Sequence, residues 1–112
     1  SIKENQFSVL DFKKEHFNIA RQGMRLAVTF GTAASMNAPY AQIAAKTGTA
    51  QVGVAKNKVN SWVIGFFPYE NPKYAFAVMM EAGPSATGSG AASIIMRQLL
   101  DWMSINTPEY FK

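Results

Sequence analysis

The sequence contains no cysteine and only one histidine, His16, among its 112 residues. Without cysteine the chain can form neither disulfide bonds nor thiolate metal sites. It also has no cluster of histidines or spaced carboxylates, so we predict no metal site and no cofactor. A Ser-His-Asp triad would have to be built around His16, which lies near the start of an expected helix. We therefore interpret His16 as a helix-surface residue.

Charged residues are sparse, at 16% of the chain, and the net charge of +4 arises from 11 Lys and Arg against 7 Asp and Glu. The basic residues are dispersed along the chain, which argues against a nucleic-acid partner. No apolar run is long enough to cross a bilayer, and no signal-like segment follows Ser1. We expect any targeting or anchoring segment to lie outside this chain.

The first expected element is a helix over roughly residues 13 to 30. Asp11 is the predicted N-cap, Glu15 lies nearby, and Gly31 is the expected breaker. Apolar residues recur at helical spacing between them, at Phe17, Ala20, Met24, Ala27 and Val28.

Three strands are expected after a small and polar loop. They cover residues 42–54, 60–67 and 74–81, and we expect a turn at 56–58 between the first two. The links are too short for a crossover helix, so the strands should form an antiparallel meander.

The chain should close with a helix. GPSATGSG at 83–90 reads as a flexible connection, and residues 91–103 have helical periodicity. The predicted fold class is α/β of the α+β kind: a helix, a three-stranded antiparallel sheet and a C-terminal helix. The middle strand lacks polar alternation, so both faces of the sheet should be apolar. Two helices can cover one face, and we expect the other to need further protein.

Two stretches, one rich in glycine and one containing a lysine, resemble nucleotide-binding motifs only superficially. Residues 88–93 lack the third glycine of a dinucleotide fingerprint and the parallel strand that should follow it. A hinge loop with an N-cap is the simpler interpretation. Lys46-Thr47 is not a phosphate-binding loop, because no glycine directly precedes the lysine and the pair lies within a strand pattern.

The remaining candidate is Lys46-Thr47-Gly48-Thr49, within a stretch that otherwise reads as a buried strand. Taken alone, it could be a strand whose lysine extends to solvent and whose threonines favour β structure. The longer stretch A-A-K-T-G-T-A-Q, residues 44–51, resembles the third active-site motif of penicillin-binding proteins and serine β-lactamases.

Further matches lie on both sides of this motif. Gly23-Met24 followed by Gly31-Thr32-Ala33 looks like the helix and "G-T-A" that lead into this strand in penicillin-binding transpeptidases. Residues 60–83 are similar to their next two strands, with an aromatic "G-F-x-P" and a proline-containing turn. The resemblance covers nearly the whole chain and is closest to the class B, elongation-type enzymes that are like penicillin-binding protein 2.

One position departs from the family pattern. Ala45 stands where the family more often has glycine before the lysine. A methyl group there could tighten the packing, and we see no reason for it to abolish activity.

The resemblance implies that residues 1–112 are the C-terminal portion of a peptidoglycan D,D-transpeptidase domain. Such an enzyme cross-links stem peptides through an acyl-serine intermediate and is acylated by β-lactams. Lys46 would then place positive charge beside the serine of a second motif. The hydroxyls of Thr47 and Thr49 would meet the substrate carboxylate, and Gly48 would leave room for substrate. The backbone N–H of Thr49 would serve as an oxyanion donor while substrate docks like an added strand.

The nucleophile of this family, the serine of Ser-x-x-Lys, is not in this chain, because no serine is followed three positions later by lysine. The chain alone is therefore predicted to be inactive and to need the N-terminal part of the same domain. Ser35-Met36-Asn37 and Ser104-Ile105-Asn106 match the second motif, Ser-x-Asn. We interpret both as chance matches, since that motif stands well upstream of the lysine strand in the family.

The resemblance also implies partners and a location. Expected partners are a peptidoglycan stem peptide, β-lactams, the N-terminal part of the domain and other cell-wall synthesis proteins. The expected location is the periplasmic side of the bacterial inner membrane, with the anchor outside this chain. Three alternatives stay open: a β-lactam sensor domain, a non-catalytic binding module of the same fold, and a free-standing structural module.

Overall fold

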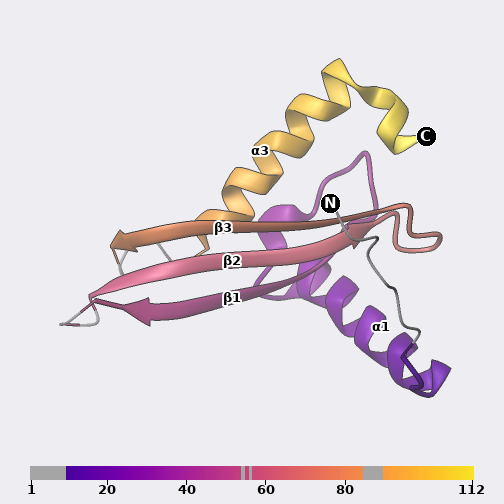
Figure 1. The fold of residues 1–112 in the computed structure, drawn as a ribbon. Coiled ribbons are helices and arrows are strands. Elements are labelled where there is room, and N and C mark those ends of the chain that lie inside the picture. Colours follow the sequence, from indigo (N-terminus) through magenta and orange to yellow (C-terminus); the bar gives the residue numbers. More distant parts are fainter. Residues whose placement is uncertain (1–9, 54, 56, 85–89) are drawn as a thin grey trace, which may run out of the picture.

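The computed structural model describes residues 10–53, 55, 57–84 and 90–112 (Figure 1). The predicted order of a helix, three strands and a helix is confirmed, with two short 3-10 turns in addition. In chain order, the elements are α1 (Lys14–Phe30), η1 (Ala34–Met36), β1 (Ala44–Val52), β2 (Lys58–Phe67), β3 (Tyr74–Pro84), α3 (Ala91–Asn106) and η2 (Pro108–Phe111).

The three strands form one antiparallel sheet in the order β1-β2-β3, so the predicted meander is confirmed. β2 is the central strand. Lys46 of β1 lies opposite Ile64 of β2, and Trp62 of β2 lies opposite Met79 of β3. A register shift interrupts the pairing of β2 with β3 between Val59 and Ser61.

β1 is shorter than predicted at both ends. It begins at Ala44, since the carbonyl of Gln42 accepts a hydrogen bond from Tyr69 N–H in the turn after β2, at 2.9 Å. It ends at Val52, and Gly53 follows with φ +89°, a left-handed backbone that suits glycine. The predicted end at residue 54 lies outside the described residues.

β2, β3 and α3 are instead longer than predicted. β2 begins at Lys58, which was predicted to be in the turn, while residue 56 lies outside the described part. β3 continues to Pro84 and α3 to Asn106, beyond the predicted ends at 81 and 103. Of the predicted connection 83–90, residues 83 and 84 belong to β3 and residues 85–89 are outside the described residues.

The prediction that Asp11 caps α1 is wrong. The N-cap is Lys13, whose side chain makes no capping hydrogen bond. Asp11 lies two residues upstream of the cap position. The first turn is instead closed by the N–H groups of His16 and Phe17, which donate to the Lys13 carbonyl. Glu15 lies in the first turn, where a negative charge favours the positive end of the helix dipole.

α3 begins with a cap from another element. Gly90, at its N-cap position, has φ +81° and offers no side chain. The hydroxyl of Ser61, on β2, accepts a hydrogen bond from Ala92 N–H at 3.0 Å, and both residues are buried. The predicted N-cap is thus replaced by a side chain from the sheet, which satisfies one of the free N–H groups of the first turn.

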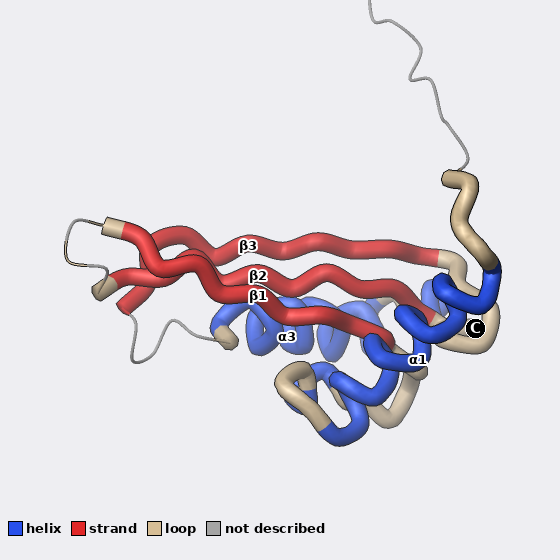
Figure 2. Tube along the Cα trace, turned by 90° about the horizontal axis from the view of Figure 1, so that it is seen from below, coloured by secondary structure: helices blue, strands red, loops and turns tan. Residues whose placement is uncertain are grey.

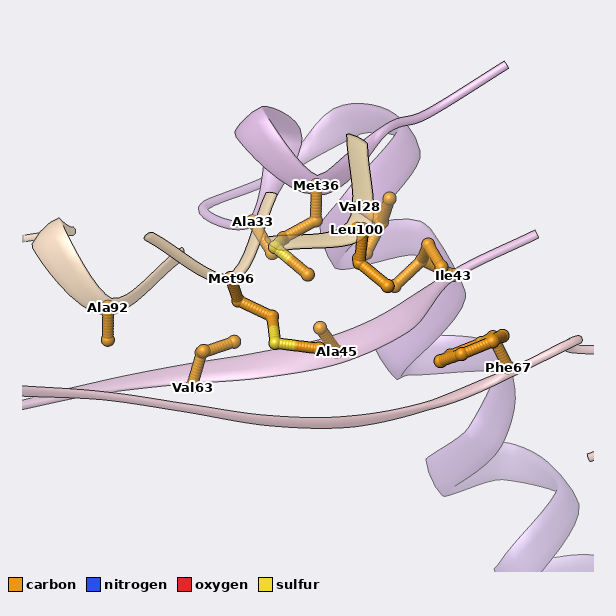
Figure 3. Packing of buried hydrophobic residues seen from close by; sticks show 10 residues of the cluster. All are labelled: Val28, Ala33, Met36, Ile43, Ala45, Val63, Phe67, Ala92, Met96 and Leu100. Carbon is orange, nitrogen blue, oxygen red and sulfur yellow. The ribbon is translucent and has the colours of Figure 1, made fainter. Parts of the chain in front are cut away.

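The hydrophobic core lies between α3 and one face of the sheet (Figure 3). Met96 extends from α3 toward Ala45 on β1, and Val63 of β2 lies beside them. The cluster comprises Val28, Ala33, Met36, Ile43, Ala45, Val63, Phe67, Ala92, Met96 and Leu100. The loop between α1 and β1 thus belongs to the core.

The opposite face of the sheet is apolar and largely uncovered. Figure 2 views the sheet from this side, with α3 behind the strands and α1 near the start of β1. Trp62, Ile64 and Met79 remain 43%, 49% and 41% exposed on it. The expectation that two helices cover one face holds for α3 but not for the whole of α1: Val28 of α1 joins the core, whereas Arg21 lies over Phe66 on the opposite face. That the other face needs further protein stays a prediction.

A polar cluster joins α3 to the loop before β1. Asp101 accepts hydrogen bonds from Tyr40 Oη at 2.6 Å and from Arg97 Nε at 2.8 Å. Arg97 also donates to the carbonyls of Ser35 and Asn37. The pKa of Tyr40 is raised, first by burial of its hydroxyl and second by its hydrogen bond to Asp101. The pKa of Asp101 is lowered, mainly by the hydrogen bond from Arg97 and also by the one from Tyr40.

We expect Gly65→Ala to destabilise the protein by about 1 to 3 kcal/mol, the range for overpacking a filled site. A Cβ at this position would collide with the Ala44 carbonyl oxygen and with the Phe76 ring. Urea denaturation of the variant and the parent measures the difference. Gly23→Ala is the matched control: a Cβ there meets nothing within 4 Å, and alanine favours the helix. Equal stability of both variants would contradict the packing described here.

We expect Tyr40→Phe to destabilise the protein near neutral pH, because Asp101 loses a hydrogen bond from a half-buried donor. The pKa of Tyr40 is raised on folding, so its contribution is complete below the ordinary tyrosine pKa of about 10 and is lost as the pH rises above it. The stability difference between parent and variant should therefore narrow above about pH 10. Urea titrations from neutral to alkaline pH measure it, and a difference independent of pH would rule out this coupling.

Candidate functional site

The predicted motif, Lys46 to Thr49, lies in the middle of β1 at the edge of the sheet. Within the described part of the chain, β1 pairs with β2 alone, so its outer edge carries no strand. A free edge presents backbone N–H and C=O groups to which an extended peptide can pair.

The register divides the motif between the two faces of the sheet. Directly opposed residues share a face in an antiparallel pair. Lys46 and Gly48 therefore lie on the uncovered face with their partners Ile64 and Trp62. Thr47 lies on the α3 face with its partner Val63, as does Thr49 with its partner Ser61. A peptide lying along the free edge can be contacted by side chains from both faces.

Lys46 is an exposed cation with no carboxylate partner in the described structure. Its Nζ donates to the carbonyl of the next residue, Thr47. The ion pair found among the described residues joins Arg97 and Asp101, at a different place. The charge of Lys46 is thus available to a ligand, and apolar Ile64 lies opposite it.

Thr47 is half-buried and hydrogen-bonded. Its hydroxyl lies 3.1 Å from the hydroxyl of Thr32, which follows α1. Thr49 is exposed on the same face of β1. In the sequence, Thr32 stood out only as a member of "G-T-A", and no role was predicted for it. That motif was the signal that could have indicated a role near β1.

Gly48 has space for a Cβ on the uncovered face of the sheet. A Cβ added there would meet Trp62 Cβ at 3.7 Å, an ordinary contact. The neighbouring protein atoms therefore do not demand glycine at this position. The predicted reason for Gly48, close approach of a substrate to the strand, stays a prediction.

Two arginines on α1, neither of which was predicted to have a role, hold the residue before β1 and the turn after β2. Arg25 Nη1 donates to the carbonyl of Ile43 at 2.8 Å, three residues before Lys46. One helical turn earlier, Arg21 Nη2 donates to the Tyr69 carbonyl at 2.7 Å and lies over the rings of Phe66 and Tyr69. Their i, i+4 spacing places both on one face of α1. This spacing was visible in the sequence, but their carbonyl partners were not.

A cavity of about 340 Å³ lies near the start of β1. Its walls come from Arg25, the loop 38–42, Phe67, Pro68 and Phe111. None of the four motif residues lines it. The cavity is therefore separate from the candidate site.

Other candidate chemistry is placed away from this strand. His16 is exposed on α1, as predicted. The hydroxyl of Ser104 donates to the Asp101 carbonyl within α3, and Ser35 lies in η1. Across the described residues, no group of three or more His, Cys, Asp or Glu could hold a metal ion. No described helix is both long and apolar enough to span a membrane.

Comparisons with known proteins agree on one family. Residues 1–101 match the family of the penicillin binding protein transpeptidase domain. The chain is 41% identical over 68 residues to peptidoglycan D,D-transpeptidase PbpA of Mycobacterium tuberculosis, covering 56% of this chain and 14% of the relative. It is 32% identical over 123 aligned positions to peptidoglycan D,D-transpeptidase MrdA of Escherichia coli, and the alignment covers 89% of this chain and 18% of the relative. The chain thus spans less than a fifth of the length of these relatives.

Solved structures share the fold. The crystal structure of PBPA from Mycobacterium tuberculosis matches with a TM-score of 0.59 and 34% identity, over 75% of this chain and 21% of that one. Penicillin-binding protein 2 of Helicobacter pylori, in its complex with MreC, matches with a TM-score of 0.65 and 25% identity, over 85% of this chain and 18% of that one. By sequence and by fold, this chain belongs to the penicillin-binding protein transpeptidase domain family.

Proposed function

We propose that residues 1–112 form the C-terminal part of a peptidoglycan D,D-transpeptidase domain and supply its Lys-Thr-Gly-Thr strand. The observation that carries the proposal is the position of Lys46 to Thr49 on the free edge of the sheet, with the lysine exposed and unpaired by any described carboxylate. Relatives named peptidoglycan D,D-transpeptidase support it. The nucleophilic serine lies in a portion outside these residues.

The proposed reaction has two steps. The serine oxygen attacks the carbonyl carbon between the last two D-alanines of a stem peptide, the C–N bond breaks, and D-alanine leaves after its nitrogen takes a proton. An amine of a second stem peptide then attacks the acyl-serine, releases the serine and forms the cross-link. A β-lactam enters the first step alone, through opening of its ring C–N bond.

Each motif residue has a role in this proposal. Lys46 lies beside the serine of the second motif, and its positive charge favours the proton transfers and the approach of a carboxylate. Thr47 and Thr49 offer hydroxyls to that carboxylate, and Gly48 lets the substrate lie against the strand. The Thr49 N–H donates to the developing oxyanion while the peptide pairs along the edge of β1.

The uncovered face of the sheet supports the proposal that the nucleophile lies in another portion of the domain. Trp62 and Ile64 form an exposed apolar surface next to Lys46, and such surfaces mark interaction sites. We propose that the N-terminal part of the same domain packs against this surface. Its serine would then lie on the lysine side of β1.

The relatives support a proposal for the setting of this domain. We propose an elongation-type enzyme like penicillin-binding protein 2, active on the periplasmic side of the inner membrane and anchored by a segment outside residues 1–112. The Helicobacter pylori relative was solved with MreC, which supports other cell-wall proteins as partners.

Benzylpenicillin acylation tests this function. The protein that carries these residues is incubated with the drug, denatured so that any companion chain is released, and weighed by intact-mass spectrometry. One adduct, on a polypeptide with Ser-x-x-Lys, is the expected result. Absence of any adduct would contradict the proposal and leave a binding module of the same fold. An adduct that is not discharged to an acceptor peptide would instead favour a sensor domain.

We expect Lys46→Ala, introduced into the complete protein, to lower the acylation rate constant about a hundredfold or more, the loss typical of removing a preorganised electrostatic group. Lys58→Ala is the matched control, since Lys58 is an exposed lysine on the neighbouring strand. Stopped-flow or quenched-flow acylation measures both variants. An unchanged rate in Lys46→Ala would rule out the role assigned to this lysine.

A further inference from the structure

We infer that Thr32 is a positioning residue whose hydroxyl orients the hydroxyl of Thr47 toward the carboxylate of the substrate. The inference deepens the proposed function and rests on it. Thr32 lies in the turn after α1, 15 residues before Thr47, and reaches β1 only through the tertiary fold.

The two hydroxyls form a coupled pair. Their oxygens are 3.1 Å apart, and each hydroxyl has one proton to donate and two lone pairs to accept. If Thr47 donates to Thr32, its proton is occupied. If Thr32 donates to Thr47, the Thr47 proton is free for a ligand. A carboxylate only accepts hydrogen bonds, so its binding selects the second arrangement.

The backbone on both sides of Thr32 is firmly held. The N–H groups of Gly31 and Ala33 both donate to the Ala27 carbonyl at 3.0 Å. Ala33 is fully buried in the core, and its own carbonyl accepts from Met36 N–H at 2.9 Å. Thr32 is therefore an exposed side chain on a fixed backbone, as a residue that orients another must be.

The glycine before Thr32 contributes to this arrangement. A Cβ on Gly31 would lie 3.0 Å from Ala27 Cα and 3.1 Å from the Ala27 oxygen, so a larger residue would push the turn away from α1. The turn can therefore lie close against the end of the helix. This close approach fixes where the Thr32 hydroxyl meets β1.

A hydrogen bond that only stabilises the fold and one that positions Thr47 for a ligand predict different effects of removing the Thr32 hydroxyl. Thr32 is exposed and contributes no side chain to the hydrophobic core. Loss of one exposed hydrogen bond should change stability little, because water replaces the partner. Loss of the Thr32 hydroxyl as a donor to Thr47 should nevertheless weaken a ligand contact that depends on the direction of the Thr47 proton.

The experiment measures benzylpenicillin acylation and thermal stability in the complete transpeptidase that contains this chain. Thr32→Val removes the hydroxyl and keeps the shape, and Thr32→Ser retains the hydroxyl. We expect Thr32→Val to lower the second-order acylation constant about three- to tenfold, the factor for one neutral hydrogen bond, mainly through weaker binding. Thr32→Ser should keep the parent value, and both should keep the parent Tm.

A double-mutant cycle with Thr47→Val gives the decisive comparison. In the Thr47→Val background, Thr32→Val should have no further effect. An equal effect in both backgrounds, a fall in Tm that parallels the fall in acylation, or parent-like acylation of Thr32→Val would overturn this inference alone. A parent protein that is never acylated would overturn the proposed function first and this inference with it.

Discussion

The packing of α3 on one face of the sheet is the contact on which the rest of the structure depends. Met96 and Leu100 bury against the face that carries Ala45, Val63 and Phe67. Burial of a single large apolar side chain is worth about 1.5 to 3 kcal/mol, which is far more than one exposed hydrogen bond contributes. This contact determines which face of the meander is inside and therefore leaves Lys46 on the other one.

Polar contacts then determine where the functional strand begins. Arg25 holds the Ile43 carbonyl from α1, and the Tyr40, Asp101 and Arg97 cluster holds the preceding loop against α3. The Arg25–Ile43 and Tyr40–Asp101 bonds join residues 18 and 61 positions apart, while the Arg97–Asp101 bond lies within α3. Together they attach the loop before β1 to α1 on one side and to α3 on the other. β1 therefore enters the sheet in a single register, and its motif residues alternate between the two faces.

The same arrangement leaves two surfaces that a stable isolated domain would normally protect. One is the outer edge of β1, where unpaired backbone groups invite an added strand. The other is the apolar face formed by Trp62, Ile64 and Met79. Lys46 lies where the two meet. The proposed function gives each surface an occupant: substrate along the edge, and the remaining part of the domain on the face.

The sequence by itself determined the order of the elements, the antiparallel meander and the identity of the motif strand. Helical spacing, short links and apolar strands are local signals, and A-K-T-G-T-A-Q is specific enough to indicate the family. The strand ends and the cap of α1 were predicted less well, since they depend on single hydrogen bonds such as Tyr69 to Gln42.

Only the tertiary structure decided which side chains meet across the fold. Ser61 caps α3, Arg25 binds Ile43 and Thr32 reaches Thr47, with separations of 31, 18 and 15 residues. No periodicity in the sequence encodes such pairs, because each exists only once α3 has packed on the sheet and drawn the loop before β1 into the core.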